Sequence, residues 1–188
     1  FDSYLYLEKD EVLEAIEKVY KSVGSAHVKT YLENNGIKDT IKMAVIIQEM
    51  LDPEVSGVAF GLNPNTGNTD EKIITAVYGV GEGVVSGTLN ADTFVVKGAW
   101  IQKDIVTKEQ QGRKGSKGTV MYASVDPDKR QQSTLTDDQI HEVARYLTQL
   151  EDALGGPQDI EFAYLNDTLY LLQTRPVTTK IKSKDDQK

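Results

Sequence analysis

The apolar positions near the start of the chain recur at the spacing of an amphipathic helix. Asp10 is a plausible N-cap for this helix, and Gly24 is a natural stop. A second, shorter helix is predicted from Val28 to Asn35, with its end at Gly36. The apolar side of the first helix consists of Val12, Leu13, Ile16, Val19, Tyr20 and Val23.

A third helix has the clearest pattern in the sequence. Thr136 and Gln139 form a capping box, and Leu135 lies where a hydrophobic staple begins. Gly155 supplies the C-terminal stop. Its apolar stripe consists of Ile140, Val143, Ala144, Leu147, Leu150 and Leu154.

Short apolar runs with β-branched residues predict strands between these helices. Met43 to Leu51 is continuous and apolar, as in a strand buried on both faces. Residues 110–118, QQGRKGSKG, are polar and basic and predict a mobile surface loop. Further strands are predicted at 56–64, at 73–87 running into a glycine-rich bend, in a hairpin around Gly98, and at 120–125. Helices mixed with antiparallel strands in this order predict an α+β fold.

The stretch PQDIEFAYLNDTLYLLQTRP, residues 157–176, predicts a hairpin with unusual polar residues. Alternation puts Ile160, Phe162 and Tyr164 on the core face, with Tyr170 and Leu172 as candidates to join them. The polar residues of both strands share the other face if the residue numbers of each cross-strand pair add up to an even number. In that register Glu161 lies opposite Gln173, Asp159 lies opposite Arg175, and the loop is Asn166, Asp167 and Thr168. A two-residue Asn-Asp loop would instead put Gln173 beside Ile160.

Four polar groups on one face of this hairpin have two interpretations. A carboxylate and an amide oxygen are hard ligands that suit Mg²⁺, which usually completes its shell with water and phosphate oxygens. The Arg175 guanidinium is able to hold a phosphate. The simpler interpretation is a solvated face of an edge hairpin with an Asp159–Arg175 pair. The pattern by itself leaves both open.

Composition narrows the class of protein. The chain has 188 residues, which fits one domain or two small lobes. It has no cysteine, which excludes disulfides and thiolate metal sites and favours the cytoplasm. A net charge of −8 argues against a nucleic-acid partner, and no apolar run is long enough for a membrane helix. The missing initiator Met suggests a piece of a longer protein.

Two glycine-rich motifs lack the spacing that a nucleotide-binding loop requires. GVGEGV, from Gly79 to Val84, nearly matches a dinucleotide fingerprint, but Val84 stands where the third glycine belongs. GRKGSKG lacks the spacing of a phosphate-binding P-loop.

Five motifs in order resemble the ATP-binding region of phosphoenolpyruvate synthases, and more broadly of pyruvate phosphate dikinases and rifampin phosphotransferases. They are VIIQEML, SGVAFGLNPNTGN, ITAVYGVGEGVVSGTLNADTFVV, GSKGTVMYA and the stretch LTDDQIHEVARYLTQLEDALGGPQDIEFAYLNDTLYLLQTRPVTT. The resemblance implies an ATP-grasp fold, in which two α+β lobes hold ATP. It assigns 1–179 to the C-terminal part of that domain and 180–188 to a polar tail.

The resemblance also implies residue roles. The backbone of Gln48, Glu49, Met50 and Leu51 would border the adenine of ATP. Glu161 and Gln173 correspond to ligands of Mg²⁺ and phosphate, and Arg175 to a phosphate-contacting arginine. Asp159 matches an acidic position in the dikinases, while Glu82 matches a glycine-glutamate pair without an assigned role. Ser116 and Lys117 match a stretch that could close over the nucleotide.

The same resemblance implies an enzyme larger than this chain. It predicts an upstream lobe with a lysine and an arginine, a swivelling phosphohistidine domain and a pyruvate-binding barrel. Neither His27 nor His141 lies in a phosphohistidine motif, and His141 is expected to be structural. The implied activity is phosphotransfer from MgATP to a histidine, for phosphoenolpyruvate formation from pyruvate. Phosphate or an antibiotic as acceptor, and a non-catalytic nucleotide sensor, remain alternatives.

Overall fold

The computed structural model describes residues 2–34, 36, 42–85, 87–116 and 119–177. The chain divides into two units, Phe1–Leu51 with Lys114–Met121 and Asp52–Arg113 with Tyr122–Lys188. The predicted tail at 180–188 lies outside the described residues. No helix in the described ranges is long and apolar enough to cross a membrane.

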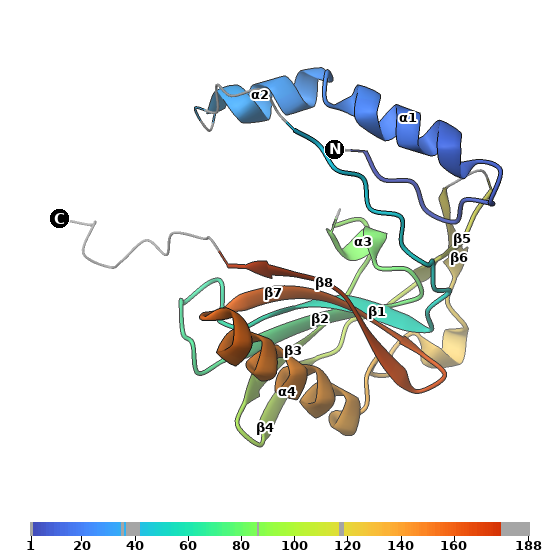
Figure 1. Cartoon of the computed structure of the whole chain (residues 1–188). Helices are drawn as coiled ribbons and strands as arrows, with labels where there is room; N and C mark the ends of the chain where they lie inside the picture. The colour runs from blue at the N-terminus through green and yellow to red at the C-terminus, as the bar shows by residue number, and fades with distance from the viewer. Residues whose placement is uncertain (1, 35, 37–41, 86, 117–118, 178–188) are drawn as a thin grey trace. The chain divides into compact units, whose positions relative to one another are not determined.

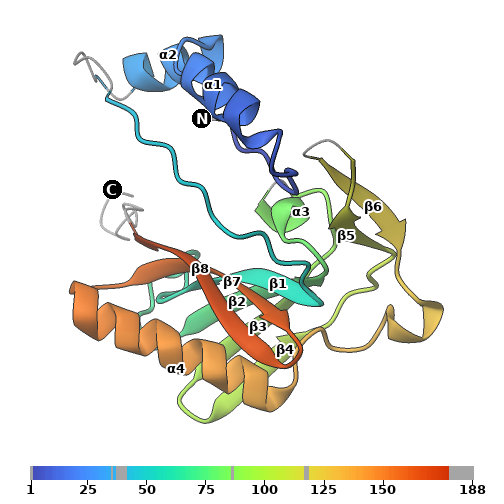
Figure 2. The same ribbon diagram turned by 45° about the vertical axis from the view of Figure 1, so that its right-hand side comes forward.

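A six-stranded antiparallel sheet forms the frame of the second unit (Figures 1 and 2). Its strand order is β4-β3-β2-β1-β7-β8, and every neighbouring pair is antiparallel. The strands are β1 (Val55–Phe60), β2 (Lys72–Tyr78), β3 (Asp92–Lys97), β4 (Trp100–Asp104), β7 (Gln158–Leu165) and β8 (Thr168–Pro176). The hairpin between β3 and β4 turns at Gly98, as predicted, where φ is 58°. Together with the helices, this sheet confirms the α+β class.

Helix α4 (Asp137–Leu154) lies along one face of the sheet (Figure 1). The predicted capping box of Thr136 and Gln139 is confirmed, and Gly155 ends the helix in the left-handed conformation at φ 80°. Alternate strand residues and the α4 stripe from Ile140 to Leu150 form the core, whereas Leu154, predicted as part of that stripe, is 56% exposed. The fully buried members of the core include Ile74, Phe94, Ile140, Val143, Leu147, Ile160 and Phe162. Burial of these side chains determines which face of each strand points towards α4.

The opposite face of the sheet carries half-buried apolar residues beside polar ones. Val58 on β1 lies between Glu161 on β7 and Thr75 on β2. Phe60 lies next to Asp159 in the same way. Directly paired residues share a face of an antiparallel sheet, so the polar positions of β7 belong to this face and not to the α4 core.

The first unit contains both predicted N-terminal helices, α1 (Val12–Ser22) and α2 (Ala26–Asn34). The N-cap prediction is wrong by one position. Glu11 is the N-cap instead of Asp10, and it makes no side-chain capping bond within the helix. Glu11 instead accepts a hydrogen bond from the backbone N–H of Glu8 at 2.9 Å.

The buried strand predicted from Met43 to Leu51 is not formed. These residues have no strand assignment, and the side chains of Ile46 and Ile47 are 85% and 68% exposed. A β-branched apolar run favours a strand only where a neighbour supplies backbone hydrogen bonds and a covering layer. No described strand pairs with this segment. The composition of this segment favours a strand, but no described strand supplies the hydrogen bonds that a strand needs.

The polar stretch predicted as a loop contains a strand. Gln110–Lys114 forms β5, which pairs with β6 (Val120–Ser124) in a two-stranded sheet. Gly112 of β5 accepts a hydrogen bond from the N–H of Val80 at 3.0 Å. A side chain at Gly79, where φ is 74°, would meet the Gly112 oxygen at 2.0 Å. Backbone contact between two glycines thus joins β5 to the end of β2. The remaining short elements are α3 (Glu82–Val85) and η1 (Pro127–Lys129).

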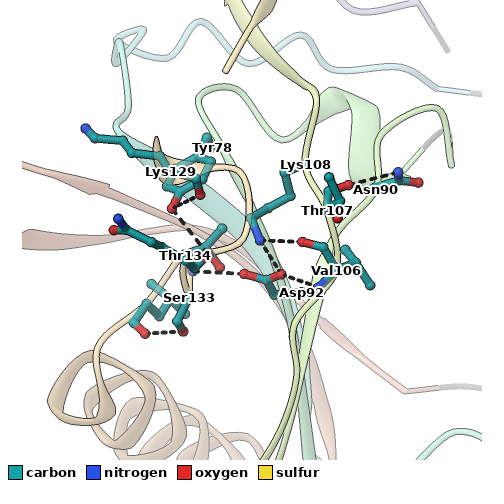
Figure 3. Close-up of polar contacts among 11 residues, drawn as sticks. Tyr78, Asn90, Asp92, Val106, Thr107, Lys108, Lys129, Ser133 and Thr134 are labelled. Atoms are coloured by element: carbon teal, nitrogen blue, oxygen red, sulfur yellow. Dashed lines mark hydrogen bonds and ion pairs between the residues drawn. The ribbon is translucent and has the colours of Figure 1, made fainter. Parts of the chain in front are cut away.

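A buried ion pair holds the connections at one end of the sheet (Figure 3). Lys108 Nζ lies 2.6 Å from Asp92 Oδ1, and the two side chains are 1% and 0% exposed. Asp92 also accepts hydrogen bonds from the backbone N–H groups of Val106, at 3.1 Å, and Thr134, at 2.9 Å. Lys108 Nζ donates to the Val106 carbonyl at 2.8 Å. Two connecting segments are therefore attached to the start of β3.

Tyr78 covers this ion pair from the end of β2. Its ring centre lies 5.8 Å from Lys108 Nζ, and its hydroxyl donates to the carbonyl of Lys129 at 3.3 Å (Figure 3). Burial, together with the negative charge of Asp92, raises the pKa of the Tyr78 hydroxyl. The hydroxyl therefore stays protonated and able to donate over a wider pH range than a free tyrosine.

We expect Lys108→Met to lower the free energy of unfolding by about 3–5 kcal/mol, because it leaves the Asp92 carboxylate buried without its cation. Urea unfolding of the 188-residue chain measures this. The control is Lys103→Met, because Lys103 pairs with Asp137 at the surface and should contribute less than about 1 kcal/mol. Equal costs for the two variants would contradict a dominant role of the buried pair.

Candidate functional site

The β7–β8 hairpin brings four predicted polar residues together. Glu161 lies directly opposite Gln173, and Asp159 lies directly opposite Arg175. This is the even register predicted from the alternation of the strand. Ile160, Phe162 and Tyr164 are at most 1% exposed on the core face, which confirms their predicted orientation.

The predicted three-residue loop is wrong. Leu165 pairs with Thr168, so the turn contains only Asn166 and Asp167, with φ values of 50° and 57°. Asn and Asp tolerate this left-handed conformation better than most residues, and such turns suit the twist of a hairpin. A two-residue turn alone would give the odd register. The chain reaches the even register because a β-bulge interrupts the pairing between Glu161 and Phe162.

Because of the bulge, the residues of β8 that face the core differ from those predicted. Phe162 pairs with Leu171 and Glu161 with Gln173, which leaves Leu172 as the extra residue. Tyr170 was expected in the core but is 38% exposed. Leu169 packs against the core instead, and Leu172 is half-buried.

Asp159 and Arg175 form a cross-strand ion pair. Arg175 Nη2 lies 2.8 Å from Asp159 Oδ2, and the side chains are 58% and 15% exposed. The simpler interpretation of these two residues is therefore met by the structure. A guanidinium has five N–H donors, so an ion pair of this kind leaves others available to a ligand. The pair orients Arg175 along the face that carries Glu161.

Glu161 and Gln173 differ from that pair because their side chains are not engaged. Within the part of the chain that the structure describes, neither forms a side-chain hydrogen bond or ion pair with another protein group. Among the described residues, no three or more His, Cys, Asp or Glu side chains lie together so that they could hold a metal. Mg²⁺ fits the oxygens present here only in its usual manner, with one or two protein ligands completed by phosphate oxygens and water.

An apolar strip adjoins these polar groups on the same face of the sheet. Phe60 is half-buried beside Asp159, and Ile73 is paired with Phe60 one strand further on. Val58 occupies the matching place beside Glu161. Oxygen ligands and a guanidinium next to an apolar surface can bind a ligand that has both a charged and a flat apolar part.

Other predicted site residues are not brought to this hairpin by the described structure. Gln48, Glu49, Met50 and Leu51 belong to the first unit, so their place beside an adenine stays a prediction. Glu82 begins α3 and makes contacts of its own. Ser116 is exposed, and Lys117 lies outside the described residues. His141 lies half-buried on α4, whereas His27 on α2 is exposed.

Sequence reasoning missed a buried amide that supports β8. Gln158 is 2% exposed, and its Oε1 accepts a hydrogen bond from Thr174 Oγ1 at 3.2 Å. Its Nε2 donates to the carbonyl of Gly156 at 3.0 Å. Thr174 stands between Gln173 and Arg175, so this bond holds the part of β8 that carries both. The sequence signal that could have indicated an irregular β8 is the conflict between a two-residue Asn-Asp loop and the even register, which the predicted three-residue loop avoids.

Comparison with known proteins gives a consistent family. The family model described as "Pyruvate phosphate dikinase, AMP/ATP-binding domain" matches residues 1–188. A probable phosphoenolpyruvate synthase of Methanocaldococcus jannaschii is 34% identical over 100% of this chain and 16% of its own length. The phosphoenolpyruvate synthase of Pyrococcus furiosus is 36% identical over 95% of the chain and 23% of its own. A rifampicin phosphotransferase of Bacillus subtilis is 38% identical over 95% of the chain and 21% of its own length. The chain therefore spans less than a quarter of these relatives.

If Glu161 serves a ligand and not the fold, removing its charge should hardly change stability. We expect Glu161→Gln to change the free energy of unfolding by no more than about 0.5 kcal/mol. The same substitution at Glu151 should cost about 1–3 kcal/mol, because it weakens a 2.5 Å ion pair with Lys72 in which both side chains are largely buried. Chemical denaturation of the two variants checks this. A larger loss at Glu161 than at Glu151 would indicate a structural role for Glu161.

Proposed function

Since this chain belongs to the family of pyruvate phosphate dikinase AMP/ATP-binding domains, we propose that it binds MgATP through the β7–β8 hairpin. Glu161 and Gln173 would hold Mg²⁺ and phosphate oxygens, and Arg175 would contact the phosphates. The fold proposed for the complete domain is ATP-grasp. The first unit would contribute the backbone of Gln48 to Leu51 to the adenine.

One observation carries this proposal. Glu161 and Gln173 lie opposite each other on the sheet face away from α4, with side-chain oxygens that no described protein group engages. Oxygens that no protein group engages are available to coordinate a cation without giving up an existing contact. A metal with its phosphates would use them, and the neighbouring Arg175 would balance the remaining phosphate charge. The apolar strip of Val58, Phe60 and Ile73 gives the less polar part of the nucleotide a surface to pack on.

The proposed reaction is transfer of a phosphoryl group from MgATP to a histidine on a separate swivelling domain. Phosphoryl transfer needs little covalent chemistry from the protein, so the work is positioning and charge neutralisation. When bound, the metal would neutralise charge that develops on the phosphate oxygens. Arg175 would share this role. Asp159 keeps the Arg175 guanidinium oriented through the 2.8 Å ion pair.

For the final acceptor we propose pyruvate, with phosphoenolpyruvate as product. Two of the relatives above are phosphoenolpyruvate synthases by name, and the GSKGTVMYA stretch leans towards that group. An antibiotic acceptor is the second candidate, because the Bacillus subtilis relative is a rifampicin phosphotransferase. A non-catalytic nucleotide sensor is less favoured, because Gln48, Glu161, Gln173 and Arg175 are all retained.

Calorimetric titration of the chain with MgATP tests the site directly. We expect binding that Glu161→Gln weakens about 10-fold or more, because a charge-assisted contact of about 1.5–3 kcal/mol is lost. The control is Asp104→Asn. Asp104 lies in the same row of the same sheet face, reached from Glu161 through Val58, Thr75 and Thr93. Asp104 is four strands away from Glu161, at roughly 19 Å. The Asp104→Asn substitution should therefore leave the affinity for MgATP unchanged. Equal affinities for wild type and Glu161→Gln would contradict the proposed metal site.

The transfer step is tested in the full-length protein. We expect Glu161→Ala to abolish formation of phosphohistidine from MgATP while the circular dichroism spectrum and unfolding transition stay those of wild type. The reason is that the phosphates would lose the metal that orients them, although the fold does not use the Glu161 carboxylate. Normal phosphorylation of this variant would overturn the assignment of Glu161.

A further inference from the structure

The β8 strand reaches the candidate site in a register that its own turn does not produce. Between the turn and the bulge, pairs such as Leu165 with Thr168 and Phe162 with Leu171 follow the odd register. Beyond the bulge the register is even, and it continues to the pair of Gln158 with Pro176. One extra residue, Leu172, separates the two parts of the strand.

Without this shift the polar face would not exist. Continuing the odd register past Phe162 would put Leu172 opposite Glu161 and Thr174 opposite Asp159. Gln173 would then lie beside Ile160, which is fully buried against α4. A one-residue slip moves every side chain to the other face of a strand. The amide of Gln173 and the charge of Arg175 would both turn towards the core face.

The two ends of the hairpin have different requirements, which explains the position of the bulge. On the turn side, Leu169 packs against the core, as Phe162 does on β7. On the site side, the buried amide of Gln158 holds Thr174 Oγ1 at 3.2 Å, and Arg175 pairs with Asp159. Bulges are frequent next to functional sites because they re-aim side chains. Here the bulge lies between a part of β8 that serves the core and a part that serves the site.

We propose that Leu172 is a positioning residue: as the extra residue of β8, it offsets the two-residue turn and places Gln173 and Arg175 on the face of Glu161 and Asp159. Gln158 secures the shifted register through Thr174. The inference rests on the proposed function only for the identity of the ligand, since the register is a property of the chain itself.

Engineered cysteines test the register without any ligand, because the chain has no cysteine of its own. Directly opposed residues of antiparallel strands have Cα atoms about 4.5–5.5 Å apart, within the range that a disulfide bridges. We expect Asp159→Cys with Arg175→Cys to form an intramolecular disulfide on mild oxidation. Asp159→Cys with Thr174→Cys is the matched control, and it should stay reduced because the two side chains point to opposite faces. Thr174 and Arg175 are both exposed, and cysteine keeps a weak S–H donor in place of the Thr174 hydroxyl, so both double variants should fold in the wild-type register. Equal or reversed yields, by mass spectrometry, would overturn the inference.

A register change tests the positioning role in binding. Inserting one alanine between Leu172 and Gln173 should displace Gln173 and Arg175 by one position and weaken MgATP binding at least 10-fold. Removing Tyr170 from the insertion variant restores the number of residues between the turn and Gln173, and should return the affinity to within about threefold of wild type. A purely structural role predicts no such rescue of affinity.

The outcomes separate this inference from the proposed function. An insertion variant that folds and binds MgATP as wild type does would overturn the positioning role, and so would failure of the compensated variant, once folded, to regain affinity. If the wild-type chain does not bind MgATP in calorimetry, the proposed function fails, while the cysteine pairs still decide the register. If the insertion variant does not fold, the cysteine pairs again decide.

Discussion

The alternation of side chains along antiparallel strands is the constraint on which the second unit depends. The same rule that sends Ile160 and Phe162 into the core sends Asp159 and Glu161 to the opposite face. The core therefore positions the candidate site without contacting it. Because burial against α4 holds one face of β7 in place, the polar face is held equally well, and β8 must match it residue by residue to present Gln173.

Two ion pairs in this unit illustrate different uses of charge. Asp92 and Lys108 are almost completely removed from water, and Asp92 accepts backbone hydrogen bonds from two connecting segments, so this pair organises chain connections. Asp159 and Arg175 are paired at an edge of the sheet, where Arg175 remains largely exposed. The first pair stabilises the fold, because removing one partner leaves the other charge buried and unpaired. The second contributes less to stability, and it fixes the orientation of the Arg175 guanidinium on the face that carries Glu161.

The hairpin turn and the site place conflicting demands on β8. A two-residue turn of Asn166 and Asp167 closes the hairpin with the twist that antiparallel strands favour. That turn sets a register in which Gln173 faces the core. The bulge at Leu172 satisfies both demands by interrupting one position of the ladder. The bulge thus separates a part of β8 that packs against the core from a part that carries the polar residues of the candidate site.

Local patterns in the sequence determined the elements whose stabilising contacts lie close along the chain. These include α4 with its Thr136–Gln139 capping box, the turn at Gly98, and the alternation of β7 that puts Glu161 on the face away from the core. Tertiary structure alone decided what depends on distant partners. The apolar run from Met43 to Leu51 forms no strand because no described strand pairs with it, and polar Gln110–Lys114 does form one because β6 supplies the hydrogen bonds. Leu172 became the bulge because β7, the turn and the α4 core act on β8 together, and no short stretch of sequence contains all three.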